Sequence, residues 1–575
     1  MNANKLESIN KMILVCLCFG LFLASCEVTD TTTDSSSKNS SNHTKQKVAK
    51  RAGAPLFDGM GDFSHPITTS DRFVQRYFDQ GMVLAFGFNH AESIRAFKAA
   101  QTLDPNCAMC FWGEALANGP NINVTAKGKA IMMPAARVAA YAAIQKALSL
   151  KTNASQAEQD YIDALAARYN GDIDTPREPL DMAYATAMHT LSQKYPNDDD
   201  AAAMFSEALM NTMPWNYWSD DGSPKQDTVK VINALERIIA RSPKHTLALH
   251  LYIHAVEASS NPGRAEVAAD TLSNLVPGSG HLVHMPSHIY WRIGRYNDAS
   301  EANIRAAQVD EAYIAACNAQ GFYPALYYPH NIHFLWAASA MEGRSEISIE
   351  AARKVAANIR LEQIEQFPTV EFFHTIPLLA LTQFGKWDEV LAEPKPVESL
   401  AFSTAIWHYA RGVALARQGK IALATAESTA LKLLLQTDKI LFLDGNDYPA
   451  SKVLKIADDL LTGEIAMSST EHNQAIIAFE NAVIEQDSLP YTEPPFWYYP
   501  TRQSLGEALL KKGDNSEAES VYKADLKRYP RNGWSMFGLI QSLEAQGKDE
   551  EASMVKAKFD AVWSRSDVTL SGSRL

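Results

Sequence analysis

Histidines gather in one part of this sequence. Eight of the fifteen lie within residues 245–333. The interval from His250 to His284 is the same as the interval from His254 to His288. Neutral imidazole is the commonest protein ligand for transition metals. A fold that repeats at this interval would bring these side chains onto one face, so the spacing predicts a metal site.

Helix geometry favours their convergence. On a helix, residues 250, 254 and 257 lie within an arc of about 60° on one face. Neighbouring helices stack about 8–10 Å apart, so imidazoles from two helices can reach one point. We expect His250, His254, His284 and His288 at the four corners of one site. The full set of candidate ligands is His250, His254, Glu257, His281, His284, His288, His330 and His333.

This donor set suits a divalent transition metal, and the spacing does not choose among Zn, Cu, Fe and Ni. If the site is hydrolytic, Glu257 is the candidate general base. It does not complete the compact H-E-x-x-H motif of zinc proteases, because it comes after His254 and outside the pair of histidines. Two other interpretations stay open: a pocket for a polar or anionic ligand, and histidines that make only structural hydrogen bonds.

Pro286 conflicts with a continuous helix at this site. A proline inside a helix removes a backbone donor and costs about 3 kcal/mol. It also disfavours the helical region for Met285. Either the helix is kinked beside the histidines, or it begins near Pro286 and leaves His281 and His284 in the preceding loop.

A second motif, Cys107-Ala108-Met109-Cys110, opens an expected helix. A C-x-x-C at a helix N-terminus can be redox-active, because the helix dipole lowers a thiol pKa. Phe111 stands where a haem-attachment motif requires histidine. In an oxidising compartment we favour a structural disulfide between Cys107 and Cys110, or two packed thiols, over catalysis or metal binding.

The elements that must position these residues are repeated helix pairs. A recurring skeleton places small residues where two helices cross, glycine after the first helix and proline after the second. It is found in Leu505-Gly506, Leu509, Gly513, Ala518, Tyr522 and Pro530, in Gly81, Phe97, Ala100 and Pro105, in Gly294, Tyr296, Ala299 and Ala306, and in Gly412, Leu415, Gly419 and Ala424. No convincing alternating strand pattern appears, so the sequence predicts an all-α fold.

This skeleton resembles the tetratricopeptide repeat, a helix–turn–helix unit of about 34 residues. The resemblance implies an α-solenoid from residue 73 to about residue 564. It also implies that the histidines occupy first-helix positions, which line the concave groove of such arrays. A protein or a small-molecule ligand is expected to bind in that groove.

Four blocks extend the likeness: Phe86-Gly87-Phe88-Asn89-His90-Ala91-Glu92, Met213-Pro214-Trp215-Asn216-Tyr217-Trp218, Gly280-His281-Leu282-Val283-His284-Met285-Pro286-Ser287-His288-Ile289 and Pro494-Pro495-Phe496-Trp497-Tyr498-Tyr499. With them the chain resembles a family of large bacterial tetratricopeptide-repeat lipoproteins over about residues 73–560. The resemblance implies the fold and no particular activity. We expect the aromatic residues of these blocks to pack between units.

The N-terminus reads as a targeting signal. An apolar run at residues 12–24 follows two lysines and is shorter than the roughly 20 residues of a membrane span. It ends in Leu23-Ala24-Ser25-Cys26, which resembles the bacterial lipobox. The resemblance implies a signal peptide at residues 1–25 and lipidation of Cys26. Residues 26–50 are rich in Ser and Thr, so we expect a disordered tether.

The expected organisation is therefore a lipid-anchored protein of the bacterial cell envelope, with the outer membrane as its expected location. The lipid anchor is the only expected contact with a membrane. Residues 51–485 are expected to form the solenoid that contains the histidine-rich groove. A Pro- and aromatic-rich break at 486–500 separates it from a C-terminal sub-array, so the second part spans 486–575.

Charge narrows the possible partners. The chain has 53 Lys and Arg against 66 Asp and Glu, a net charge of −13, and no basic tract. Nucleic acid is thus not expected as a partner. The leading interpretation is an envelope-anchored repeat protein that binds a partner or ligand and has a metal-competent centre. The alternatives are a metal-dependent hydrolase or oxidoreductase that uses the same His/Glu cluster, and a surface glycan-binding lipoprotein.

Overall fold

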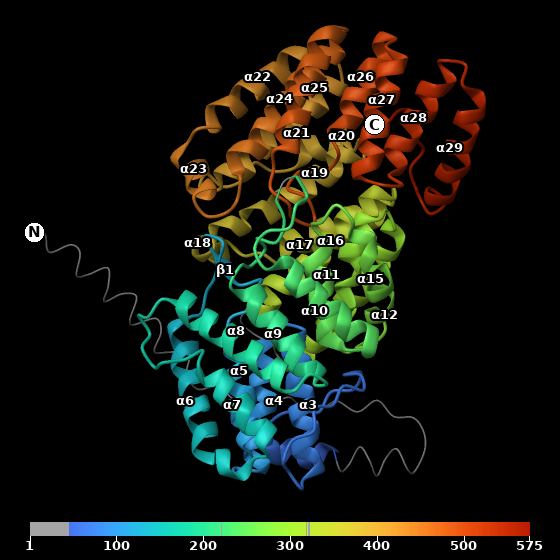
Figure 1. Cartoon of the computed structure of the whole chain (residues 1–575). Coiled ribbons are helices and arrows are strands. Elements are labelled where there is room, and N and C mark those ends of the chain that lie inside the picture. Colours follow the sequence, from blue (N-terminus) through green and yellow to red (C-terminus); the bar gives the residue numbers. More distant parts are fainter. Residues whose placement is uncertain (1–44, 220, 318, 320–321) are drawn as a thin grey trace, which may run out of the picture.

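The computed structural model describes residues 45–219, 221–317, 319 and 322–575 (Figure 1). The described chain is an α-solenoid of tetratricopeptide-type helix pairs, as the repeat skeleton predicts. All of its named elements are helical except one hairpin, which has two strands of two residues each. Its strands pair antiparallel, with Thr125 opposite Ala130 and Ala126 opposite Lys129.

The first half of the described chain contains, in order, α3 (Arg72–Phe86), α4 (His90–Leu103), α5 (Ala108–Ala117), β1 (Thr125–Ala126), β2 (Lys129–Ala130), α6 (Pro134–Leu150), η2 (Lys151–Asn153), α7 (Gln156–Ala166), α8 (Arg177–Lys194), α9 (Asp199–Asn211), α10 (Thr228–Arg241), α11 (Thr246–Val256), η3 (Pro262–Ala265), α12 (Glu266–Leu272), α13 (Gly280–His284), α14 (Pro286–Arg292) and α15 (Tyr296–Cys317).

The second half contains η4 (Tyr323–Tyr327), α16 (Tyr328–Met341), α17 (Ser345–Ala357), α18 (Leu361–Gln366), η5 (Pro368–Thr375), α19 (Ile376–Gln383), α20 (Trp387–Ala392), α21 (Ala401–Arg417), α22 (Ile421–Leu434), α23 (Asp438–Asp444), α24 (Ala450–Ser468), α25 (His472–Asp487), α26 (Arg502–Lys512), α27 (Asn515–Arg528), α28 (Gly533–Glu544) and α29 (Asp549–Val562).

Glycines on the first helices allow the close crossings that the repeat skeleton predicts. A Cβ on Gly81 or on Gly113 would stand 2.7 Å or less from the ring of Phe97, which lies on the helix between them. Gly506 and Gly538 make the same approach to Tyr522, at 2.4 and 2.2 Å. Each large ring therefore fills the space that two glycines leave, and this packing fixes the stacking of consecutive units.

The C-terminal units pack back onto the middle of the array. The indole nitrogen of Trp534 donates to the carbonyl of Ala340 at 2.9 Å, and the carboxylate of Asp567 accepts from the amide of Ser345 at 2.7 Å. One hydrophobic cluster includes buried residues of both expected parts, from Ala52 to Ala552. The array is thus closed onto itself rather than open along its inner face.

The structure describes the N-terminal region only from residue 45 onward. The signal peptide, Cys26 and most of the tether lie outside the described residues. The tether is expected to reach residue 50, and this is wrong for its end, because residues 45–52 form a helix. Ala52 in that helix is buried against the main core, which explains its order. Within the described part of the chain, every helix is too short or too polar to cross a bilayer.

Candidate metal centre

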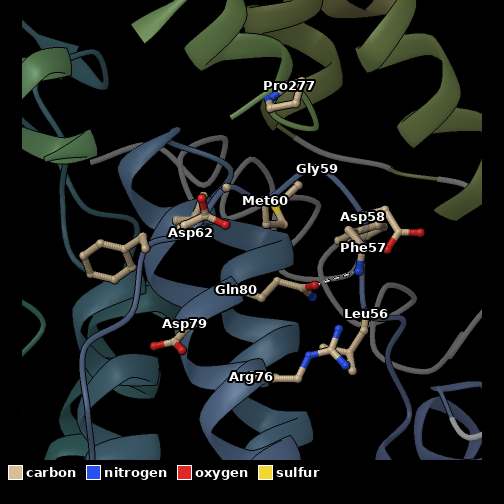
Figure 2. Close-up of a pocket in the computed structure, with 13 residues that line it drawn as sticks. Leu56, Phe57, Asp58, Gly59, Met60, Asp62, Arg76, Asp79, Gln80 and Pro277 are labelled. Atoms are coloured by element: carbon tan, nitrogen blue, oxygen red, sulfur yellow. Dashed lines mark hydrogen bonds between the residues drawn. The ribbon is translucent and has the colours of Figure 1, made fainter. Parts of the chain in front are cut away.

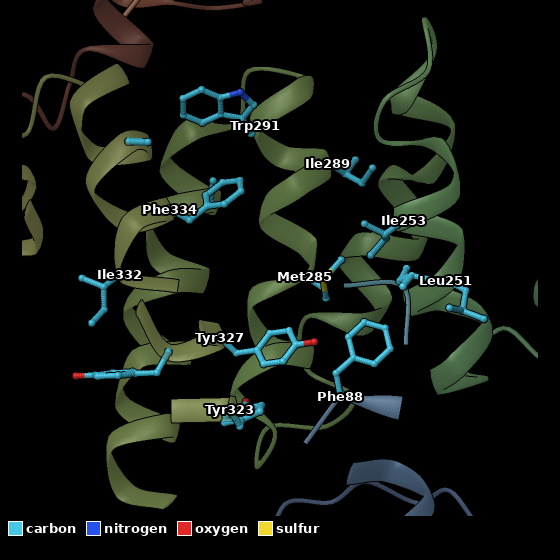
Figure 3. Packing of buried hydrophobic residues seen from close by; sticks show 14 of the residues in the cluster. Phe88, Leu251, Ile253, Met285, Ile289, Trp291, Tyr323, Tyr327, Ile332 and Phe334 are labelled. Carbon is cyan, nitrogen blue, oxygen red and sulfur yellow. The ribbon is translucent and has the colours of Figure 1, made fainter. Parts of the chain in front are cut away.

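Three consecutive first helices carry the candidate ligands, as the repeat spacing predicts. His250 and His254 lie on α11, His281 and His284 lie on α13, and His288 follows on α14. The next first helix, α16, carries His330 and His333. Figure 3 shows apolar residues of the same three layers, including Ile253, Met285 and Phe334, packed side by side. This packing holds the helices that present the histidines.

The break at Pro286 is small. Met285, between α13 and α14, keeps helical dihedral angles of φ −52° and ψ −36°. Pro286 occupies the first position of α14, where a missing backbone N–H costs least. The alternative that places His281 and His284 in a loop is wrong, because both lie within the helical turn of α13.

The histidines are buried, which differs from the expected open groove. His250 and His284 have no exposed surface, and His288 keeps only 4%. His330 is partly buried. The resemblance places them on a concave face open to ligands, whereas the C-terminal return and aromatic neighbours cover that face. Groove positions have here become core positions.

Six of the imidazoles form two groups. In each group the candidate ligand atoms lie within 4.8 Å of one another. The first histidine trio is His250, His254 and His281, and the second histidine trio is His284, His288 and His330. This differs from a single site with four corners, because the two histidines of α13 approach opposite neighbours. The ring centroid of His281 is 5.0 Å from that of His250, and His284 is 4.8 Å from His330.

The first trio presents nitrogen atoms that have no hydrogen-bond partner among the described residues. These are Nε2 of His250, Nε2 of His254 and both ring nitrogens of His281. Burial lowers the pKa of all three side chains, so they are neutral at neutral pH. Buried polar atoms are usually satisfied, and leaving one unpaired costs about 1–3 kcal/mol. Several such atoms therefore lie together in the first trio.

The second trio contains a close nitrogen–nitrogen contact. Nε2 of His284 and Nε2 of His288 are 2.9 Å apart. Burial, followed by the nearby imidazole of His330, lowers the pKa of His284 well below its ordinary value. Burial also lowers the pKa of His330. A cation between two such nitrogens would relieve a lone-pair contact of this kind.

In four of the six imidazoles, Nδ1 is held by a protein oxygen. The four contacts are His250 with the Phe86 carbonyl at 2.6 Å, His254 with Glu257 at 2.9 Å, His284 with Asn303 Oδ1 at 2.6 Å and His288 with Glu257 at 2.6 Å. The carbonyl and carboxylate oxygens only accept, so Nδ1 carries the proton and the lone pair lies on Nε2. Metal-binding histidines are characteristically held in this way by a carbonyl or a carboxylate.

Glu257 joins the two trios. Its Oε1 accepts from His254 and its Oε2 from His288, and the hydroxyl oxygen of Tyr491 lies 3.1 Å from Oε2. Burial opposes its ionisation, but His288 and the hydrogen bonds from both imidazoles prevail and lower its pKa. Both oxygens are therefore occupied by donors. Glu257 is placed to orient imidazoles, since each of its oxygens accepts from one of them, and its role as general base stays a prediction.

The segment between α25 and α26 supplies two residues that sequence reasoning missed. Tyr491 donates to Glu493 Oε1 at 2.5 Å, and Glu493 Oε2 lies 3.9 Å from Nδ1 of His288. Glu493 Oε2 is buried and has no hydrogen-bond partner among the described residues. Burial and the charge of Glu257 raise its pKa well above the ordinary value. The only local signal was an acidic residue in a Pro- and aromatic-rich stretch.

Two aromatic residues next to the first trio have left-handed backbone. Phe88 has φ +57° and Trp215 has φ +59°. The ring of Phe88 is 4.7 Å from His250 and 5.3 Å from His281, and the ring of Trp215 is 5.2 Å from His254. Figure 3 shows Phe88 beside Tyr327 at this end of the helices. Bulky residues rarely adopt this conformation, and such strain persists mainly at functional sites.

His333 stays apart from both trios. Its ring is stacked on Trp336 at 5.2 Å and contacts Phe372 and Phe373. Burial alone lowers its pKa to about 3. It belongs to neither group of convergent ligands, so this member of the predicted set packs in the core.

Cys107 and Cys110 form a disulfide at the start of α5. Sγ of Cys107 also accepts from the amide of Cys110 at 3.1 Å, so the residue caps the helix. Both cysteines are buried. Redox catalysis requires an exposed cysteine pair. Because this pair is buried and bonded, we interpret it as a structural disulfide.

A separate pocket of about 470 Å³ lies between the segment at residues 56–63, helix α3 and Pro277 (Figure 2). The side chain of Gln80 borders it and accepts from the amide of Phe57 at 2.7 Å. None of the candidate metal ligands lines it. It is therefore not the entrance to the histidine centre.

The chain has distant structural similarity to known helical-repeat proteins. No family model matches the chain, and no curated protein matches it. Among solved structures, the human IFIT1 dimer with m7Gppp-AAAA is 11% identical, with 86% of this chain and 91% of that chain covered and a TM-score of 0.30. Yeast Tom70 is 12% identical over 86% and 93%, with a TM-score of 0.26. The TPR domain of P58(IPK) is 12% identical over 83% and 99%, with a TM-score of 0.22.

Because the TM-scores of these superpositions are low, the fold is assigned from the chain's own helix pairs. The chain is a helical-repeat protein of tetratricopeptide type with two buried histidine clusters in its middle units.

Proposed function

We propose that this chain is an envelope-anchored repeat protein that binds a transition metal through the histidines of its middle units. One observation supports this above all: four buried imidazoles, two in each trio, have Nδ1 held by a protein oxygen, and the candidate ligand atoms of each trio lie within 4.8 Å of one another. A purely structural histidine uses both nitrogens for hydrogen bonds where it can. Here Nε2 of His250 and Nε2 of His254 have no hydrogen-bond partner among the described residues, and Nε2 of His284 and Nε2 of His288 contact each other at 2.9 Å.

Metal analysis of the purified full chain tests the proposal. The wild type should contain bound Zn, Cu, Fe or Ni, and replacing His254 and His288 together with alanine should remove it. His408→Ala is a matched control, because Nδ1 of His408 also lies 2.6 Å from a carboxylate, that of Glu427, away from the centre. A wild type without metal, or an equal loss in the control, would overturn the proposal.

The envelope location rests on the lipobox-like Leu23-Ala24-Ser25-Cys26. Cys26→Ser should abolish acylation and release the protein from the membrane fraction, because the acyl chains are its only expected hold on the bilayer. A variant that remains in that fraction at the processed size would contradict the anchor.

Metal-dependent catalysis is the second candidate function. Three imidazoles leave a coordination position for water or substrate, as in catalytic zinc sites. The unpartnered Oε2 of Glu493 lies beside the second trio, where an acid or base would be useful. Loading the protein with Co²⁺ and adding azide tests for the open position. A change in the visible spectrum supports the enzyme, and an unchanged spectrum indicates a closed site that only binds.

A further inference from the structure

Six imidazoles of the centre fall into two sets of three, and His288 also belongs to a third group, with Glu257 and Glu493. Within each trio the ligand atoms lie within 4.8 Å of one another, and in the described part of the chain no larger group of His, Cys, Asp or Glu meets that limit. Metal–nitrogen bonds of about 2.0–2.1 Å require the ligands of one ion to lie within about 4.2 Å of each other. Small ring movements satisfy this for three imidazoles but not for six.

The two sets are adjacent. His281 of the first trio and His284 of the second are 5.8 Å apart between ring centroids, and so are His254 and His288. Two-metal sites in proteins hold their ions about 3.5–4 Å apart. The spacing of the rings is thus compatible with a pair of neighbouring ions.

A single carboxylate serves both sets. Glu257 uses one oxygen for the imidazole of His254 and the other for that of His288. An ionised carboxylate behind a ligand raises its basicity and fixes its orientation. One carboxylate therefore orients one ligand of each set.

We propose, building on the metal site proposed above, that the centre is dinuclear, with one ion on each histidine trio. The two trios contain no thiolate and consist of imidazole alone, which suits Zn, Cu, Fe and Ni. Glu257 orients one ligand of each ion, and Phe88 and Tyr327 wall the first site through their contacts with His281.

Stoichiometry tests the proposal. The full chain is stripped of metal, titrated with Zn²⁺ or Cu²⁺ alone and dialysed, and the bound metal is counted. We expect two equivalents in the wild type. His250→Ala with His281→Ala should leave one, and His284→Ala with His330→Ala should also leave one. Both double variants keep His254, Glu257 and His288, so the buried carboxylate stays paired.

His333→Ala is the control, because it removes a buried histidine of the same helix layer outside both trios; it should keep two equivalents. One equivalent in the wild type that both double variants lose indicates one shared ion, which overturns the dinuclear centre and leaves the metal site standing. One equivalent that only one double variant loses also overturns it. A wild type that binds none overturns both proposals.

A measurement on the wild type alone covers the case in which a variant fails to fold. Cu²⁺ is added stepwise while its electron paramagnetic resonance spectrum is recorded. Two neighbouring Cu²⁺ ions interact magnetically, so the signal should broaden or weaken between the first and second equivalents. Two equivalents that give twice the isolated-ion signal, with unchanged line width, would overturn the proposal.

Discussion

The Nε2 atoms of His284 and His288 face each other at 2.9 Å, while Nδ1 of each ring is held by Asn303 or Glu257. The orientation of Asn303 is itself fixed, because its amide nitrogen donates to the carbonyl of Ala299 at 2.8 Å. Asn303 thus provides the nearer contact to Nδ1 of His284, with the Ser287 hydroxyl at 3.4 Å, and Glu257 provides the contact to Nδ1 of His288. This allows the support of each ring to be tested separately.

Asn303→Ala should weaken metal binding at the second trio without changing the first. Removing the acceptor frees the ring of His284 to rotate, and loss of such supporting contacts typically lowers metal affinity about 10–100-fold. Competition with a chromophoric chelator measures the two affinities. An equal decrease at both trios would mean that the variant disturbs the whole centre instead.

Glu257→Gln should weaken both trios. Both imidazoles donate to Glu257, and a glutamine would present an N–H to one of them. That ring must then turn away, so we expect the metal affinity to fall about 10–100-fold. Glu427→Gln provides the matched control, because Glu427 accepts from His408 in the same way far from the centre. If metal affinity is unchanged in Glu257→Gln, the carboxylate does not orient the ligands.

Trp215 allows backbone strain to be separated from packing. Its φ of +59° costs roughly 1–2 kcal/mol for a residue with a Cβ, and 40% of the side chain is exposed. Trp215→Gly should therefore unfold at a higher temperature than Trp215→Ala, since both lose the ring and only glycine is relieved of strain. Both should exchange metal faster than the wild type, because the ring covers His254. Equal melting temperatures would show that the backbone is unstrained.

Asp525 predicts a pH dependence of stability that is independent of the metal centre. Burial raises its pKa to about 7, although Ser535 donates to the carboxylate at 2.5 Å. The unfolded chain ionises near 3.9, so this one carboxyl should contribute a loss of stability as the pH rises from about 4 to about 7, seen as the difference between the wild type and Asp525→Asn. The slope is about 1.4 kcal/mol per pH unit. Asp525→Asn should lack this slope in urea unfolding at several pH values; an unchanged slope would assign it to other groups.

The helical fold and the location of the centre are accessible to sequence reasoning because both depend on local spacing. Glycines that admit Phe97 and Tyr522 recur on the first helices of consecutive units, and the interval from His250 to His284 places both on equivalent helices. These regularities need only neighbouring units. They do not depend on how the array closes.

The parts that were missed depend on long-range contacts. Tyr491 meets Glu257 across 234 residues of sequence, and nothing near either residue signals the other. The burial of the histidines and the division into two trios also follow from how the units close together. Repeat position alone did not predict the surroundings of His333. It shares helix α16 with His330, but its ring packs against Trp336 and Phe372.

The position of Tyr491 and Glu493 has a consequence for the biogenesis of the protein. His330 is the last imidazole of the trios in chain order, and helices α17 to α25 lie between it and Glu493. During synthesis or export the ligands therefore emerge well before the segment that walls them in. The centre acquires its final surroundings only when the C-terminal units have folded back.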